Sequence, residues 1–147
     1  MPTLSRCFLR GALLCLALGI VPGGLILLQK GTGWFPAFWV LLPAHTYLVL
    51  IGGMSQFTLG MCYWIFPRFD GGISRGNTTL AWASYAMLNA ALGLVVLHPL
   101  CELLFGSLAA GLAFACAGTL QGGAALTFVL HIWPRIRPSA TALQHPI

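Results

Sequence analysis

The sequence predicts an all-α integral membrane protein, a four-helix bundle with both termini on one side. The chain of 147 residues is 59% hydrophobic and only 6% charged, whereas a soluble domain is about 25% charged. Its seven basic and two acidic residues leave four uncharged segments, 11–29, 31–67, 76–101 and 103–134. Each segment is long enough to cross a hydrocarbon layer of about 30 Å. This composition excludes a soluble enzyme, a nucleic-acid-binding protein and a disordered chain.

The positions of the basic residues predict the orientation of these spans. Six of the seven lie before the first span, between the second and third, or after the fourth: Arg6, Arg10, Arg68, Arg75, Arg135 and Arg137. The opposite side has only Lys30. Because positive loops stay in the cytoplasm, we expect both termini there, in a bacterial-type inner membrane. The net charge of +5 therefore reflects topology and indicates no nucleic-acid partner.

The first expected span is residues 10–29. Two arginines precede an apolar stretch, as in a secretory signal, but no small-x-small cleavage site follows, so we expect the segment to be retained as a span. Pro22, Gly23 and Gly24 should bend or loosen this helix.

The second expected span is residues 38–66. Trp34 and Trp39 lie near one of its ends and Tyr63 and Trp64 near the other, which is typical of the aromatic belts at membrane interfaces. The sequence at 67–72 contains a proline and two glycines and should end the helix.

The third and fourth expected spans, 78–98 and 103–133, form a tight antiparallel hairpin. Asn77 or Thr78 can cap the third span, Pro99 should end it, and Pro134 should close the fourth. Small residues at spacings of three and four should let these helices pack closely: Ala86, Ala90, Gly93, Gly111, Ala115, Gly118 and Gly122. We expect one transmembrane domain over residues 1–147, with a polar tail at 139–147.

Polar residues inside a membrane are the best candidates for function, because each is costly unless it faces protein or a cofactor. At 100° per residue, His45, Gly52, Gln56 and Tyr63 fall within about 40° of one another on the second span. This face should point into the bundle. His45 is a candidate haem or metal ligand, or else donates a hydrogen bond to a neighbouring carbonyl. Gly52 and Gly53 could leave room for a flat macrocycle.

Three amides complete the set of candidates. Gln56, Asn89 and Gln121 lie at similar depths in three different spans, so they are expected either to bond one another or to contact a quinone or a porphyrin. His98 is on the same side as His45 and is the candidate second axial ligand. His131 and His145 are near the other side and cannot share a haem with His45.

The segment from Ala44 to Phe69 resembles the tenth helix of subunit I of the heme-copper oxygen and nitric oxide reductases. That helix opens with Ala-His-x-His, has a glycine eight residues after the first histidine, and ends with an aromatic residue and proline. His45, Gly53 and Phe66-Pro67 keep these spacings, while Tyr47 replaces the second histidine. The chain also resembles short four-helix proteins that are similar to subunit I, in which the last helix ends in Trp-Pro-Arg, like residues 133–135 here.

The resemblance implies a helix adapted to haem but no oxygen-reducing centre, since four spans and four scattered histidines cannot supply its ligands. With only two acids, Asp70 and Glu102, on opposite sides of the membrane, we expect no independent enzyme. The first hypothesis is a small subunit of a larger electron-transfer complex, with one haem b on His45. The second is a structural subunit of a respiratory or photosynthetic complex without a cofactor. The third is a quinone-binding module.

Overall fold

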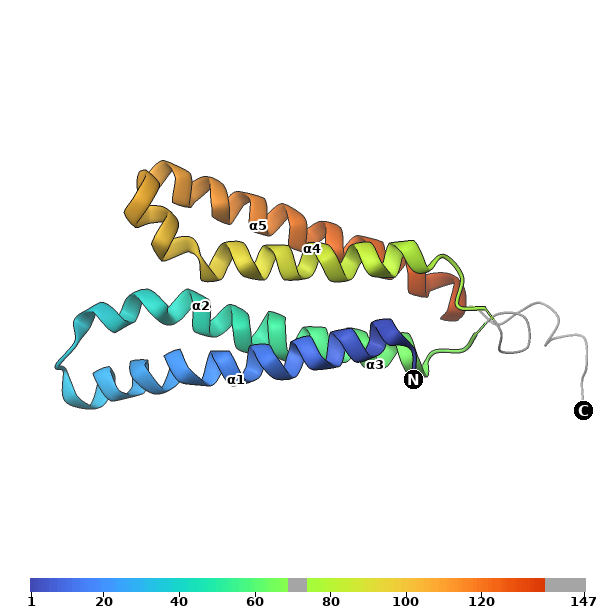
Figure 1. Ribbon diagram of the computed structural model, residues 1–147, viewed down its shortest axis with the longest axis horizontal. Coiled ribbons are helices and arrows are strands. Elements are labelled where there is room, and N and C mark those ends of the chain that lie inside the picture. The colour runs from blue at the N-terminus through green and yellow to red at the C-terminus, as the bar shows by residue number, and fades with distance from the viewer. Residues whose placement is uncertain (69–73, 137–147) are drawn as a thin grey trace, which may run out of the picture.

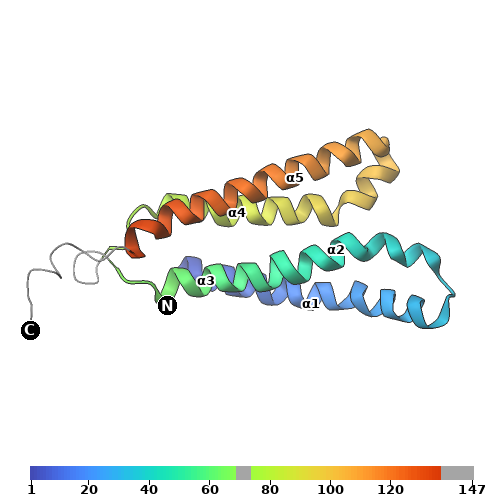
Figure 2. The same ribbon diagram turned by 180° about the vertical axis from the view of Figure 1, so that it is seen from behind.

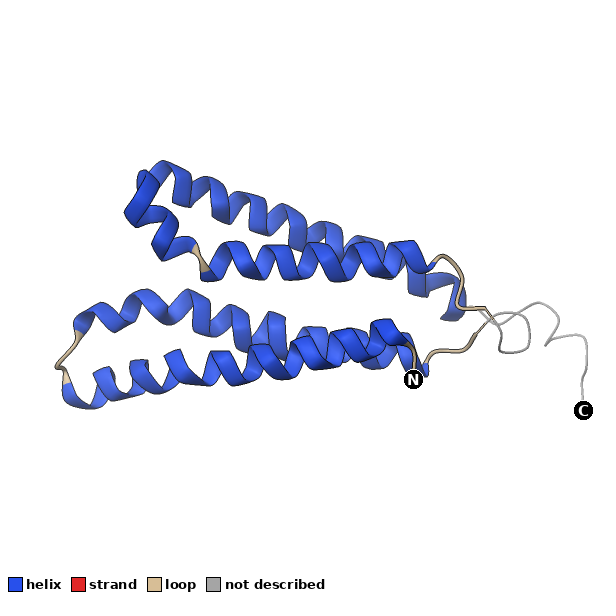
Figure 3. Ribbon diagram, in the orientation of Figure 1, coloured by secondary structure: helices blue, strands red, loops and turns tan. Residues whose placement is uncertain are grey.

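The computed structural model describes residues 1–68 and 74–136, and in this part of the chain it is helical with short connections (Figure 3). Four helical segments are long and apolar enough to cross a membrane: Thr3–Thr32, Pro36–Ile65, Thr78–Val96 and His98–Ile136, counted over the described residues. The predicted all-α fold with four spans is confirmed. The chain is a multi-pass membrane protein whose apolar helices contact the lipid bilayer.

The four spans form two antiparallel hairpins (Figure 1). One joins α1 (Thr3–Thr32) to the second span, and the other joins α4 (Thr78–Val96) to α5 (His98–Ile136). We call the end where α1 begins and α5 ends the terminal end, and the opposite end, where each hairpin reverses, the hairpin end. Both views show the two hairpins closer together at the terminal end and spread apart at the hairpin end (Figures 1 and 2).

Helix α1 is longer than the expected span, and it continues through Pro22 without interruption. A proline in a helix removes one backbone hydrogen bond, which neighbouring groups in a membrane protein can compensate. The helix ends at Thr32. The next residue, Gly33, has a left-handed φ of 72°, and its N–H donates to the carbonyl of Gln29. This is a glycine C-cap, a position where the missing side chain avoids strain.

The second span is assembled from four helical pieces. A 3₁₀ turn, η1 (Pro36–Leu41), leads into α2 (Leu42–Thr46), a π-helical stretch η2 (Tyr47–Ser55) and α3 (Gln56–Ile65). The expected helix at 38–66 therefore exists but is not a regular α-helix in its middle. Hydrogen bonds from i to i+5 widen the helix there, at the turn that carries the two adjacent glycines.

Helix α4 begins as expected. Asn77 is its N-cap, and its side-chain oxygen accepts a hydrogen bond from the N–H of Thr79 at 3.0 Å. The helix ends at Val96, two residues before the expected end at His98.

The connection between α4 and α5 differs from the four-residue loop that the sequence predicted. Residues 98–105 are helical, and the chain reverses again at Gly106, whose φ of 83° is left-handed. Pro99 is in the first turn of this helix, where its missing N–H costs nothing. The other end was also predicted wrongly, because α5 continues through Pro134 to Ile136.

The small residues predicted to join α4 and α5 do not do so. Gly111, Ala115, Gly118 and Gly122 are all exposed, and a methyl group added to any of the three glycines would meet no atom within 4 Å. The buried face of α5 has alanines at intervals of seven instead: Ala110, Ala117 and Ala124. A seven-residue interval keeps side chains on one face of a helix, so sequence spacing alone could not say which stripe faces α4.

Some predicted features lie outside the described residues. These are Asp70, Gly71 and Gly72 in the connection between the hairpins, Arg137, and the tail at 139–147 with His145.

Candidate functional site

His45 lies in the seam between α2 and α1. Its Nδ1 is 2.8 Å from the carbonyl oxygen of Gly19, and a side chain on Gly23 would collide with its ring. A carbonyl only accepts, so Nδ1 is the protonated nitrogen and donates. In the neutral ring Nε2 then keeps a free lone pair, which is the arrangement that metal-bound histidines use.

His98 is held elsewhere. Its ring lies against Phe114 of α5, with the ring centroids 4.0 Å apart. Within residues 1–68 and 74–136, no hydrogen bond or ring contact joins it to His45. The structure therefore brings the two candidate axial ligands to different hairpins.

The predicted polar face of the second span packs against α1. Along this interface, Phe8 of α1 lies beside Gly60, Gly11 beside Gln56, and Cys15 beside Gly52. Residue numbers rise on one helix as they fall on the other, so the two helices are antiparallel. The space beside Gly52 is filled by Cys15, and that beside Gly53 by Leu16. The two glycines thus let α1 approach closely, and the room predicted for a flat macrocycle is taken by side chains of the protein itself.

The three amides do not bond one another, so that prediction was wrong. Asn89 donates from Nδ2 to the carbonyl of Tyr85 in its own helix, at 2.8 Å. Gln56 is fully buried, and neither of its amide atoms has a hydrogen-bond partner. Gln121 is partly buried on α5. Gln56 packs against Gly11 of α1, close to the hydroxyl of Tyr85 in α4, while Asn89 is bonded within its own helix.

Sequence reasoning missed a cluster of polar side chains at the terminal end. Arg135 is only 4% exposed, and it donates from Nε to the carbonyl of Pro67 at 2.8 Å. Its Nη2 donates to the carbonyls of Phe66 at 2.6 Å and Tyr63 at 3.4 Å. These carbonyls lie in the last turn of α3 or just after it, where helical partners run out.

Pro67 explains why an arginine is needed there. Proline has no N–H, so the carbonyl of Tyr63 loses the partner that a continuing helix would give it. The residue before a proline also avoids helical angles, and Phe66 is extended, with ψ of 145°. The planar guanidinium has five donors, enough to satisfy the three carbonyls left open at this helix end.

His131 adds α4 to the same cluster. Its Nδ1 donates to the carbonyl of Asn77 at 2.9 Å, and its ring stacks on Tyr63 with centroids 5.4 Å apart. The guanidinium of Arg75 lies 5.8 Å and that of Arg135 5.7 Å from the centre of the Tyr63 ring, within the range of cation–π attraction. We call this group the terminal clamp: Tyr63, Phe66, Pro67, Asn77, His131 and Arg135. The signal that could have revealed it is the spacing of four between His131 and Arg135, which places both on one helix face.

A cleft of about 530 Å³ separates the two hairpins. Its walls come from α1, from the first half of the second span, from α4 and from the start of α5: Cys15, Leu18, Val21, Pro22, Leu25, Leu41, Ala44, Leu48, Asn89, Leu92, Gly93, Val96 and Pro99. The lining is alkyl apart from Cys15 and Asn89. His45 and His98 are each adjacent in sequence to a lining residue, but their rings are not part of the lining.

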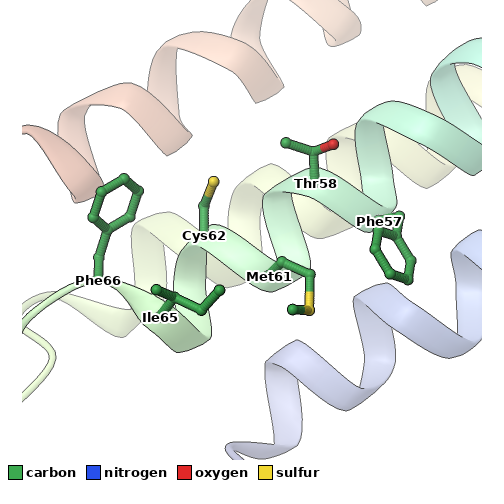
Figure 4. A pocket seen from close by; sticks show the side chains of 6 residues that line it. All are labelled: Phe57, Thr58, Met61, Cys62, Ile65 and Phe66. Carbon is green, nitrogen blue, oxygen red and sulfur yellow. The ribbon is translucent and has the colours of Figure 1, made fainter.

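A smaller hollow of about 230 Å³ lies along α3, and Figure 4 shows its six lining side chains on consecutive turns of that one helix and just beyond its end. Thr58 is its only hydroxyl, and this donates to the carbonyl of Met54 at 2.9 Å. This hollow therefore presents an alkyl and aromatic surface.

The remaining ligand-type side chains do not gather. All five cysteines are free thiols. Over the described residues, no three histidine, cysteine or acidic side chains are close enough to hold one metal ion.

No family model, curated protein or solved structure matches the chain. The resemblance of residues 44–69 to subunit I of the heme-copper reductases therefore stays a prediction.

Proposed function

We propose that the chain is a small membrane subunit of an electron-transfer complex and that its own contribution is structural. The observation that carries this proposal is that buried side-chain donors form hydrogen bonds to backbone carbonyls of other segments. Ser5 donates to the carbonyl of Gly60, and Ser84 to that of Ala124, each at 2.7 Å. His45, His131 and Arg135 likewise donate to backbone carbonyls of other segments.

Such bonds fasten one helix to another at fixed points. Each interhelical bond in a membrane stabilises the fold by about 0.6–2 kcal/mol. The side chains most capable of chemistry in this chain are thus engaged in holding its helices together. The exposed faces are apolar and suit packing against lipid or against the helices of a larger complex.

The class of partner rests on the resemblance of the second span to subunit I. The predicted orientation, with cytoplasmic termini in a bacterial-type inner membrane, is supported by the arginines at the terminal end. Arg6 and Arg10 are in the first turns of α1, and Arg75 precedes α4, whereas Lys30 is in the last turn of α1 at the hairpin end. A green fluorescent protein fused to the C terminus should fluoresce in this orientation. A fusion that is exported and does not fluoresce would indicate the opposite orientation.

A native gel tests the proposal. The tagged chain, solubilised from its own membranes in a mild detergent, should migrate in one band with larger subunits that stain for redox activity. Migration only as a monomer or homo-oligomer would contradict a role as a subunit.

A haem b on His45 is the second candidate. The observation that favours it is the hydrogen bond from Nδ1 to Gly19, because it leaves Nε2 as the nitrogen free to bind iron. His45 would be the single axial ligand, since His98 is held against Phe114. The macrocycle would have to lie away from Gly52 and Gly53, where side chains of α1 fill the space. The purified chain should then show a b-type α band on reduction with dithionite, and His45→Ala should abolish it. A band that survives this substitution would exclude His45 as the ligand.

A further inference from the structure

We propose that the cleft between the two hairpins binds a quinone, a function beyond the structural role proposed above. The cleft is well sized for this, since about 530 Å³ lies within the range of about 300–1,000 Å³ that is typical of small-molecule sites. It lies where the hairpins spread apart toward the hairpin end (Figure 1). Leu25, Leu41 and Val96 make its walls apolar near that end.

Asn89 gives the cleft its polar group. One N–H of its amide is bound to the carbonyl of Tyr85, and an amide nitrogen carries two hydrogens. The second N–H and the side-chain oxygen have no partner among the residues that the structure describes. Asn89 is half-buried and lines the cleft, so a ligand with a carbonyl at this point gains a hydrogen bond that the alkyl lining does not offer.

The depth of Asn89 distinguishes a quinone from a phospholipid chain. Asn89 is near the middle of α4, Thr78–Val96, so in a helix that crosses the membrane it lies within the apolar layer. A phospholipid keeps its polar groups at the interface, and its acyl chain would offer the amide nothing. A quinone carries its carbonyls on a ring that can enter the apolar layer, while its isoprenoid tail can follow the leucine-lined walls toward lipid.

Gly93 provides the space beside this amide. It is four residues after Asn89 and therefore on the same face of α4, and it also lines the cleft. A side chain at Gly93 would meet no atom within 4 Å. A side chain at this position therefore has room to begin, and a larger one would extend into the cleft that Gly93 lines.

Binding can be measured on the purified full chain in phosphatidylcholine nanodiscs, with decylubiquinone as the probe and empty nanodiscs as the partition blank. We expect saturable binding of about one quinone per chain. Asn89→Leu should weaken it about tenfold, as expected for one lost hydrogen bond in an apolar site. Gly93→Leu should abolish saturable binding.

Two variants outside the cleft serve as controls. Gln121→Leu removes an amide from α5, and Gly118→Leu adds a side chain where α5 is equally open; both should bind like the wild type. Binding no greater than in empty nanodiscs, or equal in all five proteins, would overturn the proposal. Loss of quinone binding in Gly93→Leu with unchanged binding in Asn89→Leu would also overturn the proposal, because the cleft would then accept any alkyl chain.

A second measurement does not depend on the substitutions at Asn89 and Gly93. In a chain that keeps only Cys15, decylubiquinone should slow alkylation of this cleft thiol by a lipophilic maleimide. An unchanged rate at saturating quinone would contradict occupancy of the cleft. Both assays use the isolated chain, so their failure leaves the proposed subunit role standing.

Discussion

The guanidinium of Arg135 donates to the carbonyl of Pro67 over 2.8 Å, 68 residues earlier in the chain. This bond fastens the end of the last span to the end of the second. A buried arginine is costly in an apolar environment, by about 2.5–3.5 kcal/mol at the centre of a membrane helix. Here this cost is offset because the guanidinium donates to backbone carbonyls that Pro67 and the end of α3 leave without partners.

Arg135→Ala should lower the free energy of unfolding by about 2–3 kcal/mol, since hydrogen bonds to a charged donor are lost and buried carbonyls are left open. Arg135→Lys should recover only part of this, because an ammonium lacks the planar fork. Unfolding in mixed micelles, followed by circular dichroism, measures both. Arg10→Ala, an exposed arginine near the same end, is the control and should change little; equal effects in Arg10→Ala and Arg135→Ala would refute the clamp.

Ser84→Ala should cost about 0.6–1.7 kcal/mol, because the hydroxyl of Ser84 bonds α4 to the carbonyl of Ala124 in α5. Ser55→Ala is the matched control, since the Ser55 hydroxyl bonds within its own span, to Leu50. The same micelle titration compares the two. If Ser55→Ala were the more damaging substitution, hydrogen bonds between helices would not be what secures this hairpin.

Gln56→Leu should be neutral or stabilising by about 1 kcal/mol. Both amide atoms of Gln56 are buried without partners, and replacing such a group with an apolar one of similar size removes a desolvation cost. Gln121→Leu, on the partly exposed amide of α5, should have no measurable effect. A clear loss of stability in Gln56→Leu would show that this amide has a bonding partner, such as a buried water, in the folded protein.

Ala117→Leu and Gly118→Leu test which face of α5 meets α4. Ala117 is 1% exposed, so a leucine there should overpack the interface and cost about 1–3 kcal/mol. Gly118 has open space beside it, so its substitution should stay within about 0.5 kcal/mol. A larger loss of stability in Gly118→Leu than in Ala117→Leu would support instead the interface of small residues that the sequence predicted.

The spans were predictable because they depend on composition, whereas the contacts between them were not. Asn77 was recognised as a cap, since capping depends on residues next to each other in sequence. The choice between the stripes at Ala117 and Gly118 depends on how a whole helix is rotated, and both stripes have helical spacing. Local sequence also gave no warning of the reversal at Gly106, which replaces the predicted loop at 99–102.

In the candidate site, too, local helical geometry was predictable and the contacts between helices were not. Placing His45, Gly52 and Gln56 on one face toward the interior needed only helical geometry, and the structure does pack this face inward. Which helix it would meet was not predictable, and the answer, α1, fills the space that had been left for a cofactor. Arg135 was missed because a charge at a span end is ordinarily a topology signal, and its three acceptors lie about 70 residues away in sequence.

The central claim is that redox chemistry belongs to the partner complex while this chain contributes structure. The most direct test is the reduced-minus-oxidised spectrum of the assembly isolated from native membranes through a tagged His45→Ala chain. We predict haem bands equal, per mole of tagged chain, to those isolated with the wild-type chain. Loss of a b-type band in the variant would place a haem on this chain, and the absence of any redox-active partner from the wild-type preparation would contradict the account.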